Sequence, residues 1–155
     1  MEKVESYGYL ITIEDPTFKL GKSISKVIQL LLQIIDFKFI ILNDLEGSGP
    51  YGVIYSLKQK MNEILDLRET SKVFDDLQFE WGDFFLFKEY PDSWQDNGDM
   101  FYPPLIAQTD TTIRAIDSQY IYIYTSYKEI VDLIMEKYLV ESVITNTLDN
   151  LSYPY

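Results

Sequence analysis

The periodicity of the apolar residues changes once along this chain, and that change limits the folds open to it. Over residues 7–14 apolar side chains alternate with a period of two, which predicts a strand. Residues 23–36 repeat apolar side chains at helical spacing, and residues 37–43 form the short apolar run typical of an internal strand. The start of the chain therefore predicts a strand, a helix and a second strand.

Helical and strand-like segments stop alternating after about residue 70. A second helix is predicted over residues 54–65 and a third over residues 126–138. Between them, strand-like segments follow one another at 74–90, 105–107, 111–116 and 120–125. A doubly wound parallel sheet would need helices between its strands throughout. We therefore predict an α+β sandwich, in which a mixed, mostly antiparallel sheet packs on about three helices and the chain begins β-α-β.

Two of the predicted helices carry recognisable start signals. Ser23 or Ser25 precedes the first apolar repeat, and serine side chains cap helix N-termini well. The third helix opens with Ser126 and Glu129 at the spacing of a capping box. We therefore expect the first helix to start near residue 23 and the third at residue 126.

The chain is predicted to form one acidic α+β domain over residues 1–155. No internal repeat or low-complexity linker divides it, and 155 residues is the usual size of a domain with a single core. Apolar residues make up 46% of the chain, which is enough to build that core. Weak alternation over residues 139–155 predicts an edge strand, and residues 150–155 are expected to form a loose tail.

Two residue types that carry much of enzyme chemistry are absent from the chain. With no Cys and no His, it offers no thiolate nucleophile, no imidazole base and no ligand set for the usual zinc sites. We therefore expect a protein that is not an enzyme and that holds no cofactor and no metal.

The net charge and the start of the chain indicate its surroundings. A formal charge of −12 is repelled by nucleic-acid phosphates and by anionic lipids, so we expect neither nucleic acid nor a membrane as partner. Residues 1–6 lack the basic and apolar regions of a signal peptide, and no apolar run reaches the roughly 18–20 residues that span a bilayer. We expect a cytoplasmic protein, with its oligomeric state left open.

The negative charge is concentrated between Glu63 and Asp99. Eleven acids and three bases lie there, so this stretch carries −8 of the total of −12. A field of one sign speeds the encounter with a partner of the opposite sign, and aromatic side chains beside charges are favoured in interfaces. We therefore predict a binding surface for a basic protein. Its candidate residues are Asp75, Asp76, Glu80, Asp83, Glu89, Asp92, Trp94, Asp96, Asp99, Phe101 and Tyr102.

A small, acidic domain without Cys or His is similar in size and composition to bacterial immunity proteins. That resemblance implies a stoichiometric inhibitor of a basic toxin, which in many such pairs is a nuclease. In that case the acids of the 63–99 stretch pair with Lys and Arg at the toxin's substrate-binding surface, while Trp94 and Phe101 act as buried anchors.

Two other classes of function remain open from the sequence. One is an adaptor or regulatory subunit that binds a basic protein, or a peptide at a sheet edge. The other is a small hydrolase that uses two carboxylates, as glycosidases do. Two acid pairs flank tryptophans, Glu80 with Asp83 and Asp92 with Asp96, but a chain with 25 acids supplies such pairs by chance.

Residues 47–52 read GSGPYG and match the G-x-G-x-x-G pattern of dinucleotide-binding loops. Asp44 and Glu46 precede the loop with negative charge, and Pro50 removes one amide donor that a pyrophosphate would need. We therefore favour a loop that only connects a strand to a helix.

Three tyrosines, Tyr120, Tyr122 and Tyr124, share one face of a predicted strand. Such a row can serve as a contact surface, but a half-buried sheet face under a helix is the more common arrangement. We favour that structural role and expect Arg114 as a neighbour across the hairpin.

Overall fold

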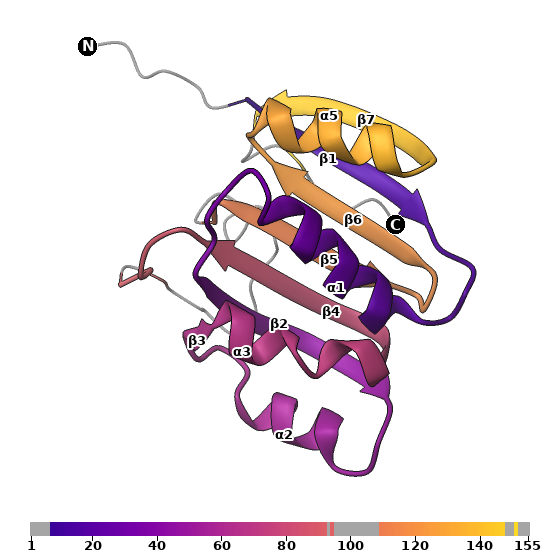
Figure 1. Cartoon of the computed structure of the whole chain (residues 1–155), viewed down its shortest axis with the longest axis vertical. Coiled ribbons are helices and arrows are strands. Elements are labelled where there is room, and N and C mark those ends of the chain that lie inside the picture. The colour runs from indigo at the N-terminus through magenta and orange to yellow at the C-terminus, as the bar shows by residue number, and fades with distance from the viewer. Residues whose placement is uncertain (1–6, 93, 95–108, 148–150, 152–155) are drawn as a thin grey trace.

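Strand-forming residues of seven segments assemble into one sheet in the computed structural model, which describes residues 7–92, 94, 109–147 and 151 (Figure 1). The strands are β1 (Tyr7–Glu14), β2 (Phe39–Ser48), β3 (Leu65–Asp66), β4 (Gln78–Phe87), β5 (Thr111–Ile116), β6 (Tyr120–Thr125) and β7 (Val140–Thr147). Their order in the sheet is β3-β2-β4-β5-β6-β1-β7, and every neighbouring pair is antiparallel. The predicted α+β class with a mostly antiparallel sheet is confirmed.

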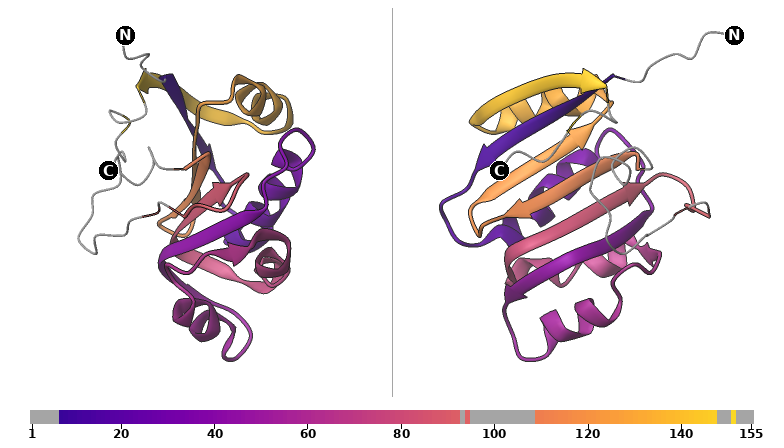
Figure 2. Two further views of the ribbon diagram at one scale, coloured as in Figure 1. Left: turned by 90° about the vertical axis from the view of Figure 1, so that its left-hand side faces the viewer. Right: turned by 180° about the vertical axis from the view of Figure 1, so that it is seen from behind.

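The helices gather on one side of this sheet. They are α1 (Leu20–Leu31), α2 (Val53–Gln59), α3 (Leu67–Ser71) and α5 (Lys128–Lys137), with a 3₁₀ turn, η1 (Phe74–Asp76). Figure 2 shows α1, α3 and α5 over the same face, while Figure 1 shows α2 beyond the β2 edge. The chain does begin β-α-β, but three strands separate β1 from β2, since β4, β5 and β6 insert between them.

Alternation along the strands separates the two faces of the sheet. The face under the helices is apolar, and one row of directly paired residues crosses it from β2 to β7: Leu42, Phe84, Ile113, Ile123, Ile11 and Val143. All of these except Val143 are buried, and each buried side chain of this size contributes roughly 1.5–3 kcal/mol. The core of the domain therefore lies between the sheet and α1 and α5.

The predicted helix starts were wrong. Helix α1 begins at Leu20 after Lys19, without a side-chain cap, and Ser23 instead donates its hydroxyl hydrogen bond to Asp15. Helix α5 begins after Tyr127, also without a side-chain cap, so Ser126 and Glu129 form no capping box. Tertiary packing of the apolar face of each helix sets these boundaries, because capping contributes only about 1 kcal/mol.

Other predicted segments differ from the structure in their lengths. The second helix ends at Gln59 rather than near residue 65. The strand-like stretch over residues 74–90 is the turn η1 followed by the single strand β4. The predicted strand at 105–107 lies outside the described residues. The hairpin of β5 and β6 and the edge strand β7 are confirmed.

The region after β7 contains one described residue, Leu151. Its side chain is 2% exposed and packs with Leu10 and Tyr124, and its N–H donates a hydrogen bond to the Thr147 carbonyl. The rest of the predicted tail at 150–155 lies outside the described residues. Within the described chain, no helix is long and apolar enough to cross a membrane.

Candidate functional site

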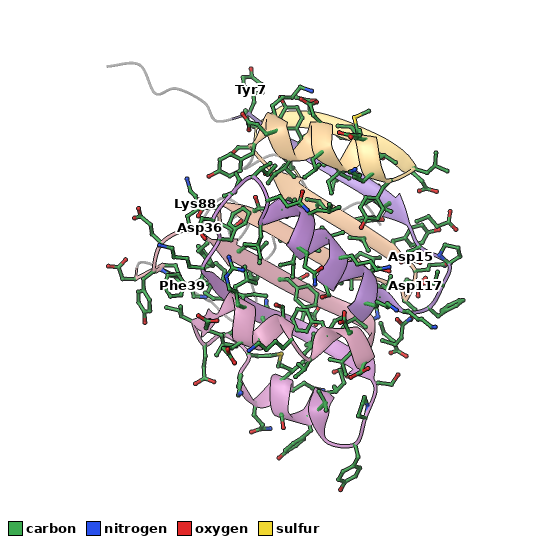
Figure 3. All side chains as sticks on the ribbon, in the orientation of Figure 1. Tyr7, Asp15, Asp36, Phe39, Lys88 and Asp117 are labelled. Carbon is green, nitrogen blue, oxygen red and sulfur yellow. The ribbon has the colours of Figure 1, made fainter. Side chains whose placement is uncertain are left out.

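Seven carboxylates lie along one end of the sheet. Strands β1 and β5 end there, and β4, β6 and β7 begin there. We call these residues the acidic rim: Glu14, Asp15, Asp75, Asp76, Glu80, Asp117 and Glu141. Figure 3 shows Asp15 and Asp117 together at this end, away from Asp36 and Lys88. Neighbouring strands lie about 4.8 Å apart, so the acidic rim extends over about 20 Å from β4 to β7.

Gln78, at the start of β4, connects the segments that carry the acidic rim. Its side-chain oxygen accepts a hydrogen bond of 2.7 Å from the Leu20 N–H, and its side-chain nitrogen donates one of 3.0 Å to the Ser118 carbonyl. The Ser118 N–H in turn donates to the Glu80 carbonyl at 3.0 Å. One glutamine therefore holds the start of α1, the start of β4 and the β5–β6 turn together.

A close backbone contact places the two acids of η1. A Cβ atom at Gly21 would lie 2.2 Å from the Phe74 carbonyl oxygen, so only glycine allows α1 to approach this closely. The Gly21 N–H donates a hydrogen bond of 3.1 Å to the Leu77 carbonyl. Asp75 and Asp76 lie between these two contacts and point outward, since both are exposed.

The β5–β6 turn exposes Asp117. Asp117 and Ser118 have φ values of 50° and 63°, as a type I′ hairpin turn requires at its two central positions. Aspartate tolerates this left-handed conformation better than most residues, because its short side chain can bond locally. The turn therefore fixes a carboxylate at the tip of the hairpin.

The carboxylates of the acidic rim lack counter-charges. None of the seven forms an ion pair with a described Lys or Arg side chain. The nearest positive side chains include Lys19 and Lys22, which line the same shallow hollow as Asp75 and Asp76. Two lysines against seven acids leave this end of the sheet strongly negative.

Two acids of the rim report this environment through their pKa values. The Glu14 carboxyl lies beside Glu141 and raises the pKa of Glu141, because two like charges disfavour each other. For Asp15, partial burial acts to raise the pKa, but hydrogen bonds from Ser23 and Thr17 outweigh it and lower the pKa below its ordinary value. Asp15 therefore stays ionised even at mildly acidic pH.

The opposite end of the sheet carries charges of both signs. Asp36 lies 3.9 Å from Lys38 and 3.9 Å from Arg68, and the Lys88 N–H donates to the Asp110 carboxylate at 2.7 Å. Glu89 and Asp92, which we predicted as binding residues, are exposed at this end. Strand β4 is ten residues long, so about 30 Å separates them from Asp75 and Asp76. The predicted acids therefore divide between two ends of the molecule.

Asp83 lies in the interior rather than on the surface. It is 1% exposed, and its Oδ1 accepts a hydrogen bond of 2.7 Å from Nε of Arg114, which is 3% exposed. Its second oxygen has no hydrogen-bond partner among the described residues. Burial raises the pKa of Asp83 to about 7, although Arg114 acts to lower it. Asp83 is therefore part of the packing of the sheet face that turns away from the helices.

Trp94 packs on that same sheet face. Its ring centroid lies 5.0 Å from that of Phe85 and 5.7 Å from that of Phe87, and the side chain is half-buried. The structure thus gives Trp94 an intramolecular contact where we expected an exposed anchor. Four further predicted binding residues lie outside the described residues: Asp96, Asp99, Phe101 and Tyr102.

The tyrosine row also belongs to this face. Tyr122 is directly opposite Arg114, as expected, and Tyr124 is 1% exposed. The row lies on the side away from the helices, while Ile121 and Ile123 of the same strand face them. Its role is structural, but α1 and α5 do not cover it.

Gly47 and Gly49 have packing roles that explain the G-x-G-x-x-G pattern. Gly47 lies inside β2, where a Cβ atom would meet the Gln78 carbonyl oxygen at 2.2 Å, and a Cβ atom at Gly49 would meet the Leu77 side chain at 2.5 Å. Only Gly52 has a positive φ, 81°, and it leads into α2. The segment is therefore a strand end and a connecting turn, as we favoured from the sequence.

The acid pairs considered for hydrolysis do not share a cleft. Glu80 is exposed whereas Asp83 is buried against Arg114, and the other pair includes Asp96, which is not described. Among the described residues, no group of three or more acids is placed to hold a metal ion. A cavity of about 510 Å³ lies between α2 and α3, but it is lined by Tyr51, Val53, Leu57, Lys60, Glu69 and Val73, with a single carboxylate.

Four acids of the rim were missed by sequence reasoning. Glu14, Asp15, Asp117 and Glu141 lie far from the 63–99 stretch in the chain, and only the strand order brings them beside Glu80. A usable signal was present, since acids that end one strand and tip a hairpin gather at one end of an antiparallel sheet. No protein-family model, curated protein or solved structure matches this chain.

Proposed function

We propose that this chain is a non-catalytic binding module that captures a basic protein through its acidic rim. The observation that carries this proposal is the run of seven carboxylates at one end of the sheet, none of which forms an ion pair with a described cation. Charges that are only solubilising need not gather in this way, whereas a negative surface for a basic partner does.

The partner is proposed to be a toxin of the kind that immunity proteins neutralise, acting in the cytoplasm. Its Lys and Arg side chains would meet the exposed carboxylates of Asp75, Asp76, Glu80 and Asp117. Long-range attraction speeds the encounter, and charge-assisted hydrogen bonds hold the complex. Inhibition is then stoichiometric, because the module covers the surface that the toxin uses for its own substrate.

The test is affinity capture from cells of the natural source with two variants of equal charge. The rim variant carries Asp75→Asn, Asp76→Asn, Glu80→Gln and Asp117→Asn. The control variant carries Glu63→Gln, Glu89→Gln, Asp92→Asn and Glu129→Gln, which are exposed and lie away from the rim. Wild type and control are expected to retain the same basic protein at low salt, and the rim variant is expected to lose it.

Equal retention by all three proteins would contradict the proposal, and so would loss by the control variant alone. A captured protein whose own activity is blocked by the wild-type module supports the inhibitor role. If the captured basic protein keeps its full activity in the complex, the adaptor alternative replaces the inhibitor while the rim remains the binding surface.

A further inference from the structure

The two edges of the sheet differ in how they end. At one edge, β3 has only two residues and is followed directly by α3. At the other, β7 has eight residues and pairs with β1 alone among the described strands. The outer side of β7 therefore presents a long row of backbone N–H and C=O groups to whatever lies beside it.

Strand β7 lacks most of the features by which proteins protect an exposed edge. It contains no Lys, Arg or Pro, and five of its eight residues are β-branched. Ile144 is 46% exposed on the face turned away from the helices. A register shift opposite Thr12 and Ile13 places a bulge near Glu141 and leaves residues 142–147 regular. This composition favours pairing with another strand.

The sequence of β7 is complementary to itself in antiparallel pairing. Opposite residues must lie on the same face of a sheet, so a two-fold axis perpendicular to the sheet can pass at Ile144. Ile144 then meets its own copy, Ser142 meets Asn146, and Glu141 meets Thr147. The exposed apolar side chain is covered, and the single charge of the strand faces a neutral residue.

The charge distribution permits this pairing despite the net charge of −12. In this register the two copies of Glu141 lie six residues apart along the strands, or about 20 Å, which exceeds the screening length of about 8 Å at physiological salt. The acidic rims of the two copies point to opposite ends of the joined sheet, since the two-fold axis reverses the strand direction. A basic partner would be drawn to the rims and not to β7.

We propose that two copies of this chain pair through β7 in antiparallel register about Ile144 and form one continuous sheet. The pairing is independent of the proposed function, because it uses a different edge of the molecule. It leaves both acidic rims accessible at opposite ends.

The absence of cysteine provides a direct test of the register. Under mild oxidation, the Ile144→Cys variant is expected to form a disulfide-linked dimer, because self-opposed residues have Cα atoms within the 4.4–6.8 Å that a disulfide spans. Ser142→Cys on the same face is the matched control. In this register its two copies lie about 13 Å apart, too far to be bridged. Equal cross-linking of both variants, or of neither, would overturn the proposal.

Analytical ultracentrifugation tests the pairing without cross-linking. The wild-type chain is expected to sediment at twice its mass of 18.2 kDa, and Ile144→Lys to sediment as a monomer, because it opposes two ammonium groups. Tyr55→Lys, at a side chain 69% exposed on α2, is expected to remain a dimer. Circular dichroism confirms folding of each variant. A monomeric wild type, or a dimer that survives Ile144→Lys, would overturn the proposal.

Salt separates this pairing from the binding of a basic partner. Added salt screens the repulsion between two acidic chains, so dimerisation is expected to be unchanged or stronger at 0.5 M than at roughly 0.05 M salt. Binding of a basic protein at the acidic rim weakens over the same range. A dimer that dissociates at high salt would contradict pairing through the nearly uncharged strand β7.

Discussion

Acidic side chains occur in two contrasting environments in this protein. Asp83 is buried in the middle of the sheet and is held by Arg114, with 2.7 Å between Oδ1 and Nε. The carboxylates of the acidic rim are exposed and have no ion pair with any described cation. A buried charge needs its counter-charge to avoid a large desolvation cost, whereas an exposed charge is solvated by water. The first environment therefore concerns folding, and the second is free to serve binding.

The largest expected effect is the loss of the buried counter-charge. Arg114→Leu removes the cation beside Asp83, and leaving a buried acid alone costs about 3–5 kcal/mol of unfolding free energy. Arg68→Leu is the matched control, because Arg68 pairs with Asp36 at 3.9 Å on the surface and such pairs contribute roughly 0–1 kcal/mol. Chemical denaturation measures both. Equal losses for the two arginines would erase the contrast between the two environments.

A second expected effect is a pH dependence that belongs to Asp83. The pKa of Asp83 is raised to about 7 in the folded protein, against an ordinary value of 3.8. Between these values the folded state binds the proton more tightly, so this carboxyl stabilises the fold at low pH and the contribution is lost as the pH rises through 7. The slope is at most about 1.4 kcal/mol per pH unit.

The difference in unfolding free energy between wild type and Asp83→Asn isolates this contribution. It is expected to move in favour of the variant as the pH rises from 4 to 8. Titration of the rim carboxylates cancels, since both proteins contain them. A difference that stays constant over this range would contradict the raised pKa of Asp83.

A smaller effect is expected at Gln78, which links the segments of the acidic rim. Gln78→Leu leaves the Leu20 N–H and the Ser118 carbonyl without their hydrogen bonds, at a cost of about 1–3 kcal/mol. Gln59→Leu, at the exposed end of α2, should change stability by less than about 0.5 kcal/mol. Faster amide hydrogen exchange at residues 117–119 in Gln78→Leu would show that the turn has loosened. Unchanged exchange there would show that Gln78 does not hold it.

The smallest expected effect concerns Glu14 and Glu141 within the rim. Glu14→Gln removes the like charge beside Glu141, so the pKa of Glu141 is expected to fall toward its ordinary value. NMR titration of the Glu141 side chain measures this shift, with Glu129→Gln as a control at a distant exposed site. The same pKa in Glu14→Gln and in wild type would mean that the rim carboxylates do not interact.

Much of the fold was predictable because local patterns agree with the tertiary structure. Strict alternation in Tyr7–Glu14 and the tight turn after Ile116 predicted β1 and the β5–β6 hairpin. Helix starts were not predictable from capping residues, since packing of α1 on η1 through Gly21 moved the start to Leu20. A local signal of about 1 kcal/mol gives way to a packed interface.

The acidic rim was only partly predictable. Counting charge along the chain found Asp75, Asp76 and Glu80, but it grouped them with Glu89 and Asp92 at the far end of β4. It also included Asp83, because periodicity alone does not tell which face of a strand is buried against a counter-charge. Strand order, which depends on non-local pairing, determines which acids become neighbours.

The most direct test of the acidic rim is the association rate of a captured basic partner at several salt concentrations. At about 0.05 M salt, the rim variant with Asp75→Asn, Asp76→Asn, Glu80→Gln and Asp117→Asn is expected to associate at least about tenfold more slowly than wild type. The control of equal charge, with Glu63→Gln, Glu89→Gln, Asp92→Asn and Glu129→Gln, is expected to associate nearly as fast as wild type, and the three rates should converge at about 0.5 M salt. Equal slowing of the two variants would mean that net charge alone drives association, and would contradict a localised binding rim.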